Sequence, residues 1–130
     1  MDSKYDTYTK DNVTVSYLLY NLLFELGLNP SSKGTIYLKE LITYVVSNNL
    51  YDYSYNDILK QFIQKNHYEN KNVKSNIKNA LYRINTNKAK SNFKTYLNLQ
   101  FDTYYLSPCN FINIIALKYN NFLYKILHFY

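Results

Sequence analysis

Apolar and polar residues recur at helical spacing along most of the chain. Apolar residues three and four positions apart lie on one face of an α-helix, so this pattern predicts helices rather than strands. The expected helices begin near residues 12, 35, 54, 70, 91 and 107. No strand pattern of comparable length competes with them, and no internal repeat is evident. We therefore expect an all-α fold, a compact bundle of about six helices.

Helix boundaries are predicted from capping residues and glycine. Gly27 should end the first helix in the left-handed conformation, and 85–90 should be a polar loop before a short helix over 91–97. Residues 1–11 are polar, so we expect a disordered tail ahead of a single domain over 12–130. We expect helix starts capped by Asn12 or Thr14, Thr35, Ser54 (with Asp57 three residues later), Ser91 and Ser107 (followed by Pro108).

The segment 70–84 separates into two faces when it is drawn as a helix. Its apolar face carries Val73, Ile77, Ala80 and Leu81 and suits a protein core. The opposite face carries cations and hydrogen-bonding groups, namely Lys71, Lys74, Ser75, Lys78 and Asn79. Such a face can grip a polyanion, which makes DNA the first partner to consider.

The positive charge of the chain is concentrated in its middle third. Between Lys60 and Lys94 there are nine cations and one acid, 9 − 1 = +8, whereas the remaining residues give 6 − 8 = −2, for the net +6 of the chain. A nucleic-acid footprint produces this clustering. A basic, solvated surface is the alternative interpretation.

A short helix over 54–65, a tight connector and the basic helix are the elements of a helix-turn-helix. In that motif the first helix braces the second, which enters the major groove. The connector lacks the glycine often found in such turns, so an ordinary helical hairpin with a basic face remains an alternative. The expected base-reading residues are Lys71, Lys74, Ser75, Lys78 and Asn79, and the expected phosphate-binding residues are Lys65, Tyr82, Lys88, Lys90 and Lys94.

Three segments, taken in order, resemble a known family. The run FELGLNPSSKGTIYLKELI over 24–42, the helix NVKSNIKNAL over 72–81 and the segment around Phe111 and Ile112 resemble the C-terminal DNA-binding domain of the stage-zero sporulation protein A response regulators. The resemblance covers roughly residues 13–118. It implies an all-helical bundle of six helices with a helix-turn-helix whose recognition helix is 72–81.

The chain departs from that family at residues that bear on DNA recognition. The recognition helix of the family reads bases with a Glu-Arg pair, and Lys74 and Ser75 occupy those positions here. Lysine lacks the bidentate fork of arginine, so the family's target sequence should not be carried over. Lys78 matches a basic position that lies against DNA in the family. We expect a stand-alone domain without the receiver domain of the family, so that aspartate phosphorylation does not control its activity.

Other chemistries find little support in the sequence. His67, His128 and Cys109 show no metal-ligand spacing, and the two glycines, Gly27 and Gly34, form no phosphate-binding loop. We therefore expect no enzyme, cofactor, metal or small-molecule substrate. No apolar run reaches the roughly 20 residues of a membrane span. The lone cysteine suits a reducing cytoplasm, and the richness in Asn, Lys, Tyr and Ile with a single Arg suits a low-GC bacterial genome.

The function expected from the sequence is sequence-dependent binding of double-stranded DNA, as a small transcription regulator or a DNA-organising accessory factor of a mobile element. Pairing of two copies on DNA is expected, because one helix-turn-helix rarely binds tightly alone. The apolar face of the tail over 120–130 could pair with a second copy, but we expect it to extend the last helix over the core. The rival function is a protein-interaction module that kept the fold and lost base reading.

Overall fold

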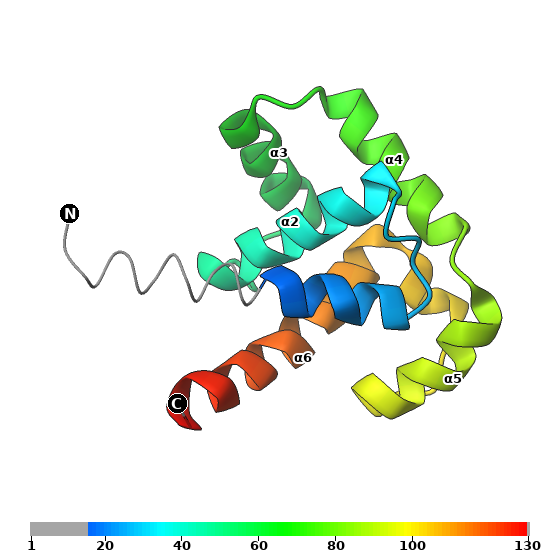
Figure 1. Ribbon diagram of the computed structural model, residues 1–130. Coiled ribbons are helices and arrows are strands. Elements are labelled where there is room, and N and C mark those ends of the chain that lie inside the picture. The colour runs from blue at the N-terminus through cyan, green and yellow to red at the C-terminus, as the bar shows by residue number, and fades with distance from the viewer. Residues whose placement is uncertain (1–15, 130) are drawn as a thin grey trace.

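The computed structural model describes the backbone of residues 16–129 and the side chains of residues 16–119 (Figure 1). Within this part the chain is all-helical and compact, with no strand. A first helix covers 16–25. It is followed by α2 (Lys33–Ser47), α3 (Tyr55–Asn66), α4 (Asn70–Tyr82), α5 (Thr86–Leu97), the 3-10 helix η1 (Thr103–Leu106) and α6 (Pro108–Phe129). The expected all-α class is confirmed. The expected tail over 1–11 and the cap at Asn12 or Thr14 lie outside the described residues.

Every α-helix contributes buried residues to one core, whereas the 3-10 helix η1 has none. α2 occupies the centre, because it packs against α3, α4 and α6. The aliphatic residues of α2 are buried except Ile36, which is exposed, and Val46, which is half-buried. Among the largest fully buried side chains are Leu19 and Leu23 of the first helix, Leu38, Leu41 and Ile42 of α2, Leu59 of α3, Ile77 of α4, Phe93 of α5 and Phe111 of α6.

Two of the expected caps are confirmed by hydrogen bonds. The Ser54 hydroxyl accepts from the Asp57 amide at 3.2 Å at the start of α3. Ser107 accepts from the Asn110 amide at 3.3 Å, and Pro108 is the first residue of α6. These motifs were predictable because each lies within four residues of sequence.

Two other expected caps were wrong. Thr35 lies inside α2, fully buried, because the helix already begins after Ser32. Asn85 caps α5 by accepting from the Lys88 amide at 3.1 Å, so the expected polar loop over 85–90 is helical from Thr86 and Ser91 lies within the helix. At α5 the earlier cap is the Asn85 side chain, whereas Ser32, the N-cap residue of α2, makes no side-chain capping hydrogen bond.

The two glycines allow close backbone contacts. Gly27 has φ +110°, as expected at the end of the first helix, and its carbonyl oxygen accepts from the Asn85 amide at 2.9 Å. Gly34 lies against the backbone of α4 at Asn76. A Cβ at either position would meet a carbonyl oxygen, Asn85 O or Asn76 O, at less than contact distance. The contacts position α4 and the start of α5 relative to the first two helices.

Candidate nucleic-acid interface

α3 and α4 are joined by a connector of three residues, His67, Tyr68 and Glu69 (Figure 1). His67 takes the left-handed conformation, with φ 56° and ψ 35°, and its amide and that of Tyr68 donate back to carbonyl oxygens of α3. A non-glycine residue can adopt this conformation at a modest energetic cost. The missing glycine therefore does not prevent a tight connection between the two helices.

Tyr68 anchors the connector to α2 and α3. Its hydroxyl donates to Oε2 of Glu40 at 2.8 Å, and its ring meets the rings of Tyr37 and Phe62 edge-on at 5.2 and 5.7 Å. The hydrogen bond to the Glu40 carboxylate, together with burial, raises the pKa of Tyr68 to about 12. These contacts fix Tyr68, which directly precedes Glu69, the N-cap residue of α4. The sequence analysis missed this role, because no local pattern pairs Tyr68 with a residue 28 positions earlier.

The apolar face of α4 is buried as expected. Val73 and Ile77 are fully buried, and Ala80 and Leu81 are nearly so. α3 buries Ile58, Leu59, Phe62 and Ile63 in the same core. However, α4 packs more extensively against α2 than against α3, so the support of α4 comes mainly from α2.

The opposite face of α4 is exposed. At about 100° per residue, the outward positions fall within an arc of about 140°. Tyr82, the last residue of α4, is 86% exposed and falls near the middle of this arc. Among the described residues, the lysines of this face have no acidic partner. The structure thus brings together all five expected base-reading residues and Tyr82 on one surface: Lys71, Lys74, Ser75, Lys78, Asn79 and Tyr82.

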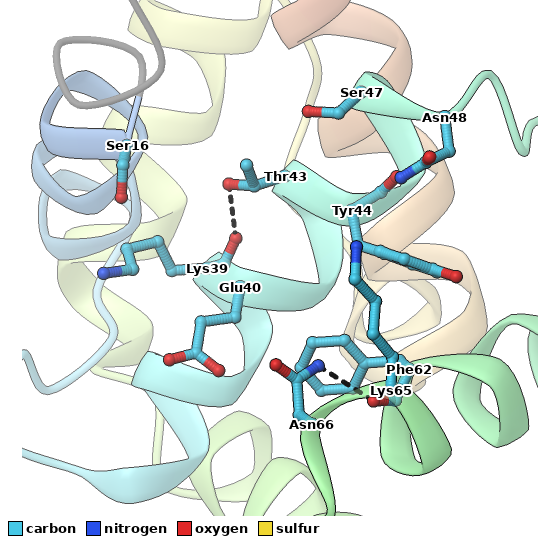
Figure 2. Close-up of a pocket in the computed structure, with 10 residues that line it drawn as sticks. All are labelled: Ser16, Lys39, Glu40, Thr43, Tyr44, Ser47, Asn48, Phe62, Lys65 and Asn66. Carbon is cyan, nitrogen blue, oxygen red and sulfur yellow. Dashed lines mark hydrogen bonds between the residues drawn. The ribbon is translucent and has the colours of Figure 1, made fainter. Parts of the chain in front are cut away.

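The expected phosphate-binding lysines have three different surroundings. Lys90 and Lys94 are exposed on α5. Lys88 is half-buried, with its ammonium 3.4 Å from the centre of the Phe24 ring. Lys65 extends toward α2, with its ammonium 5.2 Å from the centre of the Tyr44 ring (Figure 2). Lys65 therefore lines the cleft between α2 and α3.

The surface around Lys65 is a polar cleft of about 460 Å³ between α2 and α3 (Figure 2). Several of its polar groups are already used within their own helices. The Thr43 hydroxyl donates to the Lys39 carbonyl oxygen at 2.8 Å, and the Asn66 amide donates to the Phe62 carbonyl oxygen at 2.9 Å. Lys39 and Lys65 share the cleft with the Glu40 carboxylate. The cleft therefore carries both charges, whereas the exposed face of α4 carries only positive charge.

Other groups with possible chemistry are isolated. Cys109 is half-buried, and its sulfur lies 3.7 Å from the side-chain nitrogen of Asn113. His67 is an exposed connector residue. Within residues 16–119, no three histidine, cysteine or acidic side chains come together as a metal site. The side chain of His128 lies outside the described residues. None of the helices in the described part is long and apolar enough to cross a membrane.

The segment that contains α4 and α5 is basic and has no acidic residue in its sequence. From Asn70 to Leu97 there are seven cations and no Asp or Glu, and the cations are Lys71, Lys74, Lys78, Arg83, Lys88, Lys90 and Lys94.

Comparison of the chain with protein-family models, with curated proteins and with solved structures finds no match.

Proposed function

We propose that the chain binds double-stranded DNA in a sequence-dependent manner, with α4 as the recognition helix of a helix-turn-helix. The observation that carries the proposal is the exposed, acid-free face of α4, on which three lysines stand beside Ser75 and Asn79. Lysines attract the phosphate backbone, whereas hydroxyl and amide groups can hydrogen-bond to base edges in the major groove. A helix of 13 residues, about 20 Å long, fits that groove along its length.

The support beneath α4 suits this role. A reading helix has to be held rigidly, because base contacts depend on its register in the groove. Here α2 packs along the inner face of α4, and the bond between Tyr68 and Glu40 fixes its start. The resemblance to the DNA-binding domain of the sporulation response regulators agrees with this assignment. On that basis we propose a small regulator or accessory factor that acts in the cytoplasm and pairs with a second copy on DNA.

A protein-interaction module is the second candidate function. The observation that favours it is the presence of Lys74 and Ser75 where the resembled family has its base-reading Glu-Arg pair. A protein partner would then need an acidic surface that matches α4. Such a module would leave the exposed lysines of α5 without a purpose, and we therefore prefer the DNA-binding function.

The test is selection of a preferred duplex from a randomised pool, followed by fluorescence anisotropy with the purified protein. We expect an enriched sequence that binds at least about a hundredfold more tightly than a scrambled duplex. Weak, purely salt-sensitive binding without an enriched sequence would leave a non-specific DNA-binding protein. No binding even at low salt would favour the protein-interaction module.

A further inference from the structure

Helices α4 and α5 carry related sequences. The segments VKSNIKNAL over 73–81 and AKSNFKTYL over 89–97 are identical at five of nine positions, with a constant offset of sixteen residues. The expectation of no internal repeat was therefore wrong. The repeat was missed because a fifth helix starting at Ser91 divides its second copy between a loop and a helix. The matched pairs are Lys74 and Lys90, Ser75 and Ser91, Asn76 and Asn92, Lys78 and Lys94, and Leu81 and Leu97.

The structure gives both copies the same orientation toward the core. The first, fifth and ninth residues of each copy are buried, with at most 2% of their surface exposed. These residues are Val73, Ile77 and Leu81 in α4, and Ala89, Phe93 and Leu97 in α5. The repeated Lys, Ser and Lys are exposed in both helices. Each helix therefore presents the same three side chains to solvent, at the same spacing and around the same arc.

The repeated asparagine has a structural role in each copy. The Asn76 amide donates to the carbonyl oxygen of Asn72 at 2.7 Å, and the Asn92 amide donates to that of Glu25 at 2.6 Å. The Asn92 bond ties α5 to the end of the first helix. Because both amides already bind backbone carbonyls, the shared outward set consists of the two lysines and the serine between them.

α5 is held in a fixed place, as a contact helix must be. The backbone amide of Asn85 donates to the carbonyl oxygen of Gly27 at 2.9 Å, and the Lys88 ammonium lies over the Phe24 ring. The Phe93 ring packs edge-on against the Phe101 ring, with the ring centres 5.0 Å apart. The exposed face of α5 is thus ordered before any partner binds. Pre-ordering lowers the entropic cost of binding.

We propose that α5 is a second base-reading helix, which presents Lys90, Ser91 and Lys94 to DNA as α4 presents Lys74, Ser75 and Lys78. This inference rests on the proposed function. Phosphate binding needs cations at the surface, but it does not need a hydroxyl between them at the same helical position. The recurrence of the serine with both lysines points to base edges, which a hydroxyl can reach. One chain then recognises two stretches of duplex, and Lys90 and Lys94 are readers rather than the phosphate contacts expected from the sequence.

The experiment measures Kd for the selected duplex and for a scrambled duplex in matched double variants. K74A/K78A removes the α4 pair, K90A/K94A removes the α5 pair, and K39A/K118A removes two charges from α2 and α6 as a control. The ratio of the two Kd values should fall at least tenfold in the α4 and α5 variants and stay unchanged in the control. Ser91→Ala, matched with Ser75→Ala, should lower the ratio without a change in charge. Thermal unfolding by circular dichroism confirms that the variants fold.

The outcomes separate this inference from the proposed function. If K74A/K78A lowers the ratio while K90A/K94A weakens both duplexes equally, α5 only holds phosphates and the inference fails alone. It also fails alone if K90A/K94A binds like the unmodified protein. If the unmodified protein prefers no duplex, the proposed function fails and the inference fails with it.

Discussion

Gly34 in the first turn of α2 lies directly against the backbone carbonyl oxygen of Asn76 in α4, so that a Cβ on Gly34 would overlap this oxygen. The same Cβ would come within 2.6 Å of the Ala80 Cβ. The two helices therefore touch through their backbones at this point. Because α2 is the main support of α4, this contact sets how far the exposed face of α4 stands from the core.

Gly34→Ala should destabilise the protein by about 1 to 3 kcal/mol, the usual cost of overpacking a tight contact. The sign of this stability change distinguishes a tight contact from an ordinary helix position, since alanine in place of glycine stabilises an ordinary helix by up to about 1 kcal/mol. Urea unfolding measures the change. Ser47→Ala, at an exposed position of α2, should stay within about 0.5 kcal/mol of the unmodified protein. An increase in stability for Gly34→Ala would show that α2 and α4 can separate freely.

The helices and their buried faces were predictable because their signals are local. Apolar spacing identified the buried residues of α4, and the Ser54 cap and the pair Ser107 and Pro108 marked two helix starts. The same spacing placed the base-reading candidates on one exposed face. Each of these signals needs only the residues within one or two turns of the helix.

The remaining features depend on contacts between distant residues. Thr35 looked like a cap, but packing in the centre of the bundle buries it inside α2. Asn85 and Ser91 are both good capping residues, but α5 begins after Asn85. The backbone amide of Asn85 also donates to the carbonyl oxygen of Gly27, a contact with a distant part of the chain. The contact of the Lys65 ammonium with the Tyr44 ring joins residues that are 21 positions apart. A single sequence contains no local signal for these three outcomes.

Tyr68→Phe should destabilise the protein by about 1 kcal/mol, because it removes a hydrogen bond to a partly buried carboxylate and keeps the ring. The pKa of Tyr68 is raised to about 12 from 10.0, so the folded state holds the phenolic proton more tightly than the unfolded state. This contribution is fully present below about pH 10 and is lost as the pH rises toward 12.

Urea unfolding between pH 8 and 12 checks the prediction for Tyr68. The stability difference between the unmodified protein and Tyr68→Phe should shrink across the upper part of this range. Tyr82→Phe serves as the control, since the Tyr82 side chain is 86% exposed and should leave stability unchanged at neutral pH. A difference that stays constant with pH would mean that the Glu40 bond does not hold the Tyr68 proton.

Asn92→Ala should cost about 1 kcal/mol of stability, more than Asn76→Ala at the matched position of the repeat. The Asn92 amide ties α5 to the first helix through Glu25 O, whereas the Asn76 amide binds a carbonyl of its own helix. Loss of a bond between elements leaves a partly buried carbonyl without its donor. Thermal unfolding of both variants measures the comparison. Equal effects would show that α5 is held by its apolar residues alone.

Salt should weaken DNA binding steeply. If binding neutralises about six phosphates, the logarithm of the binding constant should fall with the logarithm of salt concentration at a slope of about −5. Anisotropy titrations at several salt concentrations give the slope. K39A/K118A should leave the slope unchanged, because these lysines lie on α2 and α6, outside α4 and α5. A slope near zero would mean that phosphate contacts contribute little.

Lys74→Ala should lower the discrimination between DNA sequences. Lys74 is exposed in the first half of α4, where a helix in the major groove contacts base edges, and among the described residues it has no acidic partner to hold it. The expected cost on the preferred duplex is about 1 to 3 kcal/mol, with a smaller loss on scrambled duplexes, where only the charge is missed. Parallel Kd measurements on both duplexes give the comparison. Equal losses on all DNA would show that Lys74 contacts phosphate rather than bases, and the assignment of α4 as the reading helix would then depend on Ser75 and Asn79.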